Sequence, residues 1–104
     1  MSVLLEFSIF PTDRGESVSA EVSEVIRMIR ESGCDYRLTA MGTLVETDDI
    51  SSALQLVEKA YRTLETQGCQ RVYASLKMDI RTGKNNRLSK KIASIEARIG
   101  EVDK

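Results

Sequence analysis

The chain has 104 residues, a length that fits one domain over residues 1–104 with a single modest core. Its 15 Lys and Arg residues nearly balance 16 Asp and Glu residues, and the net charge of −1 argues against bulk binding of nucleic acid or an anionic membrane. The sequence contains no histidine, which excludes His-based acid–base catalysis, Ser–His and Cys–His nucleophilic pairs and the usual zinc sites. We therefore expect a protein that is not an enzyme and that holds no metal and no cofactor.

Apolar periodicity divides the chain into seven elements in the order β-α-β-β-α-β-α. Alternation of period two predicts strands at residues 3–10, 36–40, 43–47 and 71–81. Apolar stripes predict helices at residues 17–32, from a cap at Asp48 or Asp49 to Gln67, and at residues 87–101. Asp13 or Ser17 is expected to cap the first helix, and Met41-Gly42 is expected to form a tight hairpin turn.

This order predicts an α+β fold built from a split βαβ repeat. Gly-Cys pairs end both of the first two helices, at residues 33–34 and 68–69, and support the repeat. We expect a ferredoxin-like βαββαβ sandwich: a four-stranded antiparallel sheet of order 4-1-3-2, two helices on one face and an extra C-terminal helix. Cys34 and Cys69 would then lie about 14 Å apart at opposite edges of the sheet, too far for a disulfide.

The last strand is expected to present two different faces. Its apolar residues should face the core, and these are Val72, Ala74, Leu76, Met78 and Ile80. The other face carries Tyr73, Ser75, Lys77, Asp79 and Arg81. Two interpretations remain open for Lys77, Asp79 and the neighbouring Glu6: they pair with one another across the sheet, or they line a partly desolvated pocket for a small ligand.

The face of the sheet that the two helices leave open also favours self-association. Leu4, Phe10 and Tyr73 are too apolar to stay exposed without a reason, and a symmetric homodimer formed sheet to sheet or at an edge strand would bury them. The isoleucines of the last helix likewise need a surface, either on the domain's own edge or across a subunit boundary.

Cations gather around the start of the last helix, at Arg81, Lys84, Arg87, Lys90 and Lys91. They form either a solvated basic patch or an anion site centred on Arg81 and Arg87. No aromatic residue is interleaved with them, which makes a poor nucleic-acid platform. No apolar run is long enough to span a membrane, and the first residues lack the basic region of a signal peptide, so a cytoplasmic protein is expected.

Three segments resemble a known family. They are Tyr36-Arg-Leu-Thr-Ala-Met-Gly-Thr-Leu-Val-Glu46, Arg71-Val-Tyr-Ala-Ser-Leu-Lys-Met-Asp-Ile-Arg81 with the following Leu88 and Lys91, and Phe7-Ser-Ile-Phe-Pro11. Together they resemble the small thiamine-binding protein family, which is related to the duplicated YkoF-type domains that bind thiamine or hydroxymethylpyrimidine. The resemblance covers nearly the whole chain. It implies a ferredoxin-like fold, assembly into dimers and tetramers, and a non-catalytic site for thiamine or its hydroxymethylpyrimidine moiety.

The resemblance also implies a set of ligand-binding residues: Ser8, Thr39, Met41, Thr43, Glu46, Lys77 and Asp79. Glu46 would accept hydrogen bonds from an aminopyrimidine, and the hydroxyls of Ser8, Thr39 and Thr43 would reach the ring edge. Met41 or Phe10 would pack on the face of the ring, and Asp79 would offset the thiazolium charge. By strict alternation, Thr43 and Glu46 lie on opposite faces of their strand, so both line one pocket only if the strand bulges or the pocket wraps around an edge.

We therefore expect a homo-oligomeric binding protein for thiamine or hydroxymethylpyrimidine that acts in carriage, buffering or sensing. The alternative is a structural or regulatory oligomer with an incidental anion site at Arg81 and Arg87 and no vitamin ligand. An enzyme would have to use Lys77, Asp79, Glu46 or a cysteine, and no recognised catalytic constellation contains them.

Overall fold

The computed structural model describes residues 1–104 and contains all seven expected elements. The strands are β1 (Ser2–Pro11), β2 (Asp35–Thr39), β3 (Gly42–Thr47) and β4 (Val72–Arg81). The helices are α1 (Ser19–Glu31), α2 (Ile50–Thr66) and α3 (Arg87–Ile99). Each boundary falls within two residues of the expected one, because the periodic patterns and the flanking glycines are local signals.

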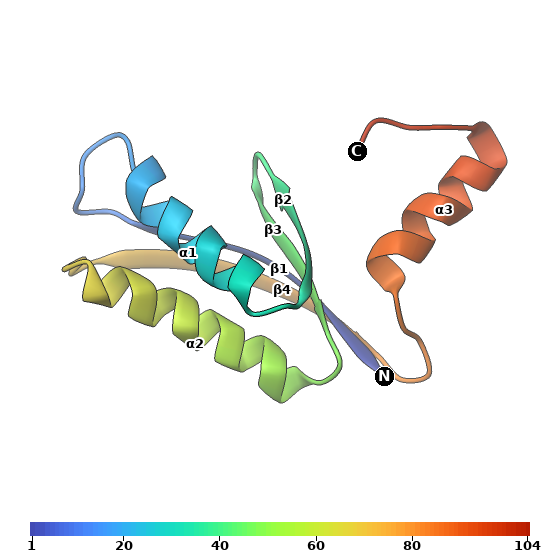
Figure 1. Cartoon of the computed structure of the whole chain (residues 1–104), viewed down its shortest axis with the longest axis horizontal. Coiled ribbons are helices and arrows are strands. Elements are labelled where there is room, and N and C mark those ends of the chain that lie inside the picture. The colour runs from blue at the N-terminus through green and yellow to red at the C-terminus, as the bar shows by residue number, and fades with distance from the viewer.

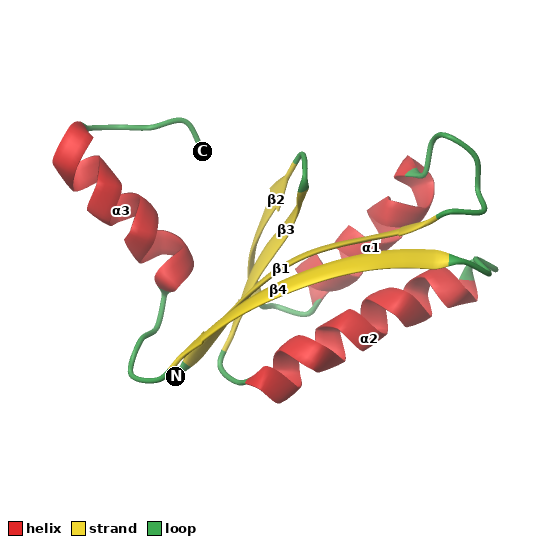
Figure 2. Cartoon of the chain, turned by 180° about the vertical axis from the view of Figure 1, so that it is seen from behind, coloured by secondary structure: helices red, strands yellow, loops and turns green.

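The four strands form one antiparallel sheet of order β2-β3-β1-β4, which confirms the expected topology. Helices α1 and α2 lie side by side against one face of the sheet, and α3 stands apart from both of them (Figures 1 and 2). The ferredoxin-like fold with an extra C-terminal helix is therefore the observed architecture. No helix of the structure is both long and apolar enough to cross a bilayer.

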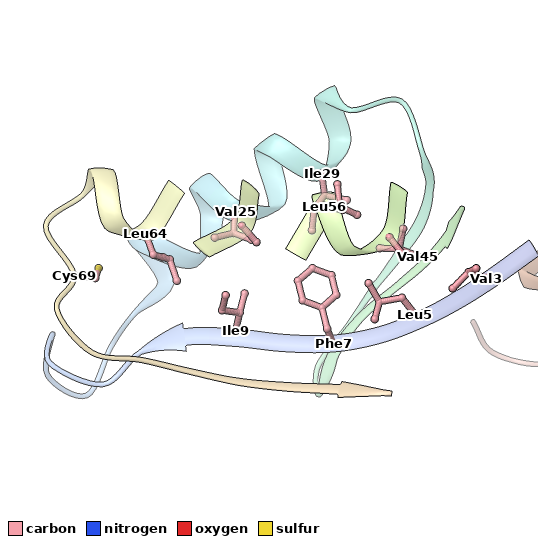
Figure 3. Close-up of a cluster of buried hydrophobic side chains, with 12 residues drawn as sticks. Val3, Leu5, Phe7, Ile9, Val25, Ile29, Val45, Leu56, Leu64 and Cys69 are labelled. Atoms are coloured by element: carbon pink, nitrogen blue, oxygen red, sulfur yellow. The ribbon is translucent and has the colours of Figure 1, made fainter. Parts of the chain in front are cut away.

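The core lies between the sheet and the two packed helices. Val3, Leu5, Phe7 and Ile9 project from one face of β1 and are all buried (Figure 3). They meet buried apolar side chains of α1, α2 and β3, namely Val25, Ile29, Val45, Leu56 and Leu64. The alternation in the first strand thus separates a core face from an open face, as the sequence predicts.

Strand β4 keeps the expected alternation, but its apolar face is not buried. Leu76 pairs with Phe7, Met78 with Leu5 and Ile80 with Val3, which places these three residues on the helix-covered side of the sheet. They are nevertheless 40%, 39% and 46% exposed, respectively. The prediction that they line the core of the single chain is wrong, because β4 is an edge strand that α1 and α2 leave largely uncovered.

The start of α1 also differs from expectation. Val18 occupies the N-cap position and no side chain caps the helix, so neither Asp13 nor Ser17 plays that role. The carboxylate of Asp13 instead accepts a hydrogen bond of 2.8 Å from the backbone N–H of Gln70, which ties the loop before α1 to the start of β4. Asp49, in contrast, caps α2 as expected and accepts from the backbone N–H of Ser52 at 2.7 Å.

The hairpin between β2 and β3 turns one residue earlier than expected, at Ala40-Met41. Thr39 and Gly42 form the last pair of the ladder, and the Thr39 hydroxyl donates to the Gly42 carbonyl oxygen at 2.8 Å. A Cβ atom at residue 42 would meet the Phe7 carbonyl oxygen at 3.1 Å, so the hairpin packs closely on β1 at this glycine. Both cysteines are free, as the sequence predicts.

Candidate functional site

A cavity of about 220 Å³ lies between the β2–β3 hairpin, the second half of β1 and the first turns of α1. We call it the hairpin pocket. Its lining contains no charged residue and consists of Phe7, Ser8, Ile9, Phe10, Val18, Val22, Val25, Ile26, Leu38, Thr39, Ala40, Met41, Gly42 and Thr43. Of the candidate ligand-binding residues, the pocket brings together Ser8, Thr39, Met41 and Thr43.

Thr43 is the most informative polar group of the hairpin pocket. Its side chain is 95% buried, being only 5% exposed, and its hydroxyl makes no hydrogen bond within the chain. Because no fully buried side-chain oxygen or nitrogen lacks a partner, the Thr43 oxygen retains some exposed surface. A hydroxyl held in an apolar hollow without a partner favours a ligand that supplies the missing hydrogen bond.

The other polar groups of the pocket are already engaged or lie at its mouth. The Thr39 hydroxyl donates to the Gly42 carbonyl oxygen and accepts from the Met41 backbone N–H at 3.3 Å. The Met41 side chain is 90% exposed at the hairpin tip. Ser8 makes no side-chain hydrogen bond and is half-buried. The pocket therefore combines apolar walls with a few hydroxyls, which is the usual character of a small-molecule site.

Lys77 and Asp79 lie elsewhere, on the open face of the sheet. Lys77 is directly opposite Glu6 in the ladder, and its Nζ lies 3.3 Å from the Glu6 Oε1. Asp79 pairs with Arg87 at 2.9 Å. The first of the two sequence interpretations, pairing across the sheet, thus describes the Glu6–Lys77 contact. The second also has support, because Glu6, Lys77 and Asp79 line a hollow between the open face and α3. This exposed ion pair contributes little to stability, about 0–1 kcal/mol.

Glu46 and Arg87 form the junction that holds α3 on the sheet, which we call the α3 anchor. The Glu46 carboxylate accepts from the backbone N–H groups of Arg87 at 3.0 Å and Leu88 at 3.2 Å. The Arg87 guanidinium donates to the hydroxyl and the carbonyl oxygen of Ser2, each at 2.8 Å, and to the Asp79 carbonyl oxygen at 2.6 Å. The Glu46 carboxylate therefore binds the N-terminus of α3, and the Asp79 carboxylate binds the Arg87 guanidinium. Arg81 is exposed at the end of β4.

The strand register places Thr43 and Glu46 on opposite faces of β3. Thr43 pairs with Phe7 on the core side, whereas Glu46 pairs with Leu4 on the open side, and the ladder between them is continuous without a bulge. The candidate residues thus divide between the hairpin pocket, the open-face row and the α3 anchor. Val18, the N-cap residue of α1, and Val22 also line the pocket. Their spacing matches a core stripe, so sequence reasoning did not mark them as pocket residues.

The α3 anchor leads to a pH-dependent prediction. Partial burial of the Glu46 carboxyl opposes ionisation, but the backbone donors of Arg87 and Leu88 prevail and lower its pKa below the ordinary value of 4.5. Ionised Glu46 therefore stabilises the fold above that value, and this contribution disappears as the pH falls through the lowered pKa. We expect Glu46→Gln to melt at a lower temperature than the wild type near neutral pH, with a gap that closes in acid. If the difference in melting temperature between the wild type and Glu46→Gln stays constant from neutral to acid pH, the charge of Glu46 has no role in stability.

A family model and several related sequences match this chain over most of its length. A family model described as "Thiamine-binding protein" matches residues 5–96. A UPF0045 protein of Mycobacterium bovis is 35% identical over 96 residues, covering 92% of this chain and 93% of the relative. A UPF0045 protein of Methanocaldococcus jannaschii is 33% identical over 93 residues, covering 89% of this chain and 91% of the relative.

Solved structures share the fold. The crystal structure of a hypothetical protein of Methanocaldococcus jannaschii, 33% identical, superposes with a TM-score of 0.78 over 90% of this chain and 95% of that chain. A Thermotoga maritima protein whose name links it to thiamine biosynthesis or salvage superposes with a TM-score of 0.77 over 91% of this chain and 99% of that chain. Its sequence identity of 20% supports the shared fold alone.

Proposed function

Because the chain belongs to the thiamine-binding protein family, we propose that its hairpin pocket binds the pyrimidine ring of thiamine or free hydroxymethylpyrimidine. The observation that carries this proposal is the hydroxyl of Thr43, a 5% exposed residue at the wall of a largely apolar cavity, which makes no hydrogen bond within the chain. An aminopyrimidine offers both ring nitrogens that accept and an amino group that donates, and a hydroxyl can satisfy either one.

The volume of the cavity is suited to a single aromatic ring. Sites for drug-sized ligands usually measure about 300–1,000 Å³, whereas the hairpin pocket measures about 220 Å³. A flat ring against the aromatic side chain of Phe7 and the thioether of Met41 would make favourable face and edge contacts. The thiazolium ring and its positive charge would remain at the mouth of the pocket, where water solvates them.

Glu46 has no place in this pocket, since it lies on the other face of β3 and caps α3. In this proposal the ring is held by the Thr43 hydroxyl and apolar contacts, without the carboxylate that the resemblance implies. The role is non-catalytic carriage, buffering or sensing of the ligand.

We also propose that the protein acts as a homo-oligomer that is joined at the β4 edge. This strand is ten residues long, its outer backbone edge has no neighbouring strand, and its helix-side residues Leu76, Met78 and Ile80 are exposed. A long apolar edge strand is a template for pairing with another chain. Two-fold pairing with a second copy would continue the sheet and cover these side chains.

Titration calorimetry with thiamine and with hydroxymethylpyrimidine tests the ligand proposal at protein concentrations well above micromolar. We expect heat and saturation with both ligands, and none with the isolated thiazole alcohol, which lacks the pyrimidine. Absence of heat with both pyrimidine ligands would overturn the proposal. It would leave the structural or regulatory oligomer as the better description of the chain.

A further inference from the structure

A cavity of about 550 Å³ lies between α3 and the open face of the sheet. We call it the α3 cleft. Leu4 and Leu44 line it from the sheet, and Leu88 and Ile92 line it from α3. Figure 2 shows α3 on the side of the sheet opposite α1 and α2, so the α3 cleft and the hairpin pocket lie on opposite faces. The volume of the cleft falls within the range of about 300–1,000 Å³ that is usual for drug-sized ligands.

The apolar lining of the α3 cleft continues into a neighbouring hollow. This second cavity measures about 590 Å³, shares Arg37, Leu44 and Ile92 with the cleft, and adds Leu38 and Ala93. Leu44 and Ile92 are only half-buried, so water touches apolar surface that a ligand would cover. A molecule with an extended apolar body therefore fits this surface better than a compact polar one.

The charges around the α3 cleft leave one cation without a partner. Four cations line it, and three of them form ion pairs with carboxylates of the chain. These pairs are Lys77–Glu6 at 3.3 Å, Arg87–Asp79 at 2.9 Å and Arg37–Asp35 at 3.0 Å. Lys91 is the fourth cation, and no carboxylate of the chain pairs with its ammonium group. The cleft thus offers one uncompensated positive charge beside an apolar floor.

We propose that the α3 cleft binds an amphiphilic monoanion, a molecule with an apolar body and a single carboxylate. The apolar body covers Leu44 and Ile92, and the carboxylate accepts a charge-assisted hydrogen bond from the Lys91 ammonium. A phosphate monoester matches less well, because its charge of about −1.5 to −2 meets the carboxylates of Glu6 and Asp79 in the same lining. This site goes beyond the proposed pyrimidine site and does not depend on it.

The α3 anchor positions the Lys91 ammonium for this role. The backbone N–H of Arg87 donates to the Glu46 carboxylate at 3.0 Å, and the Arg87 guanidinium donates to the Ser2 carbonyl oxygen at 2.8 Å. Lys91 follows Arg87 by four residues in α3, so the two side chains lie on the same side of the helix, one turn apart. The first turn is therefore fixed to the sheet before a ligand arrives, which reduces the entropy cost of binding.

Titration calorimetry with octanoate tests the proposal, and three related molecules are the controls. Octanol has the same chain without the charge, octylammonium reverses the charge, and acetate lacks the apolar body. We expect octanoate to bind about fivefold more tightly than octanol, octylammonium to bind more weakly than octanol, and acetate to give no heat. The absence of saturable octanoate binding, or equal affinity for octanoate and octanol, would overturn the proposal.

Two variants separate the charge from the apolar floor. Lys91→Met removes the ammonium and keeps an apolar stem, so it should weaken octanoate binding about fivefold and leave octanol binding unchanged. Lys90→Met makes the same change at the neighbouring position outside the cleft and should leave both affinities unchanged. Leu44→Trp fills the cleft and should abolish binding of both molecules, while circular dichroism shows that helix and strand content remain. Equal octanoate affinities of Lys91→Met and Lys90→Met would contradict the role of Lys91.

Methyl resonances in NMR spectra locate the bound octanoate. Those of Leu44 and Ile92 should shift on titration, whereas those of Val22 and Ile26 in the hairpin pocket should stay in place. Shifts confined to the hairpin pocket would overturn the assignment of octanoate to the cleft. Titration of a second sample with hydroxymethylpyrimidine reports the hairpin pocket separately, so the failure of one site is distinct from the failure of the other.

Discussion

Replacing Thr43 with Val is expected to weaken pyrimidine binding about tenfold, which corresponds to about 1.4 kcal/mol. Valine has nearly the same shape as threonine and the same preference for strands, so the volume of the hairpin pocket and the register of β3 should persist. Only the hydroxyl disappears, and the polar group of the ligand that it would meet is left buried without a partner, at a cost of about 1–3 kcal/mol. Titration calorimetry of both proteins with hydroxymethylpyrimidine measures the change.

The same substitution should leave the unliganded protein equally stable or slightly more stable. The Thr43 hydroxyl has no partner within the chain, so valine removes a poorly solvated polar group without breaking a hydrogen bond. This combination of weaker binding and undiminished stability separates a ligand-binding hydroxyl from one that serves the fold.

Thr39→Val provides the matched control, since Thr39 lies across the same hairpin. Its hydroxyl bonds to the Gly42 carbonyl oxygen and the Met41 N–H, so its loss should lower stability by about 1 kcal/mol and affect binding less than Thr43→Val. Equal affinity of wild type and Thr43→Val would remove the observation on which the pocket proposal rests.

The fold was predictable from the sequence because its signals are local. Alternation in β1 and β4 and the stripes of α1 and α2 each lie within one element, and Pro11, Gly33 and Gly68 mark element ends. The order of the elements then restricts the topology to a few possibilities, of which the split βαβ repeat is one. The alternation of side chains along β3 also predicted that Thr43 and Glu46 lie on opposite faces of the sheet.

The exposure of β4 and the α3 anchor were not predictable from local patterns. Whether Leu76 is covered depends on how far α1 and α2 reach across the sheet, which is a property of packing and not of the strand's own residues. The bond from the Arg87 backbone N–H to Glu46 joins residues 41 positions apart. From the sequence, Glu46 is expected to be a ligand carboxylate and Arg87 to be part of an anion site. In the structure the Glu46 carboxylate instead accepts a hydrogen bond from the Arg87 backbone N–H.

Replacing Phe7 with Ala is expected to have the largest effect on stability of any single change in β1, about 3–5 kcal/mol. Phe7 is 2% exposed and lies at the centre of the core, with its ring directed towards Ile29 and Leu56 (Figure 3). Neighbouring side chains come from three other elements and cannot all close on the vacated space, so a cavity should remain. Urea denaturation of the unliganded protein at fixed concentration measures the loss.

Phe10→Ala in the same strand is the control that tests the two faces of the sheet. Phe10 lies on the open face, half-buried, with its ring centroid 5.8 Å from that of Tyr73 on β4. A tilted pair of this kind contributes about 0.5–1.5 kcal/mol, so truncation in the monomer should cost several-fold less than truncation of Phe7. Equal losses for the two phenylalanines would mean that the open face is packed as tightly as the core. Assembly of two chains over that face would produce this result. Dilution would then reduce the loss of stability caused by Phe10→Ala and leave the loss caused by Phe7→Ala unchanged.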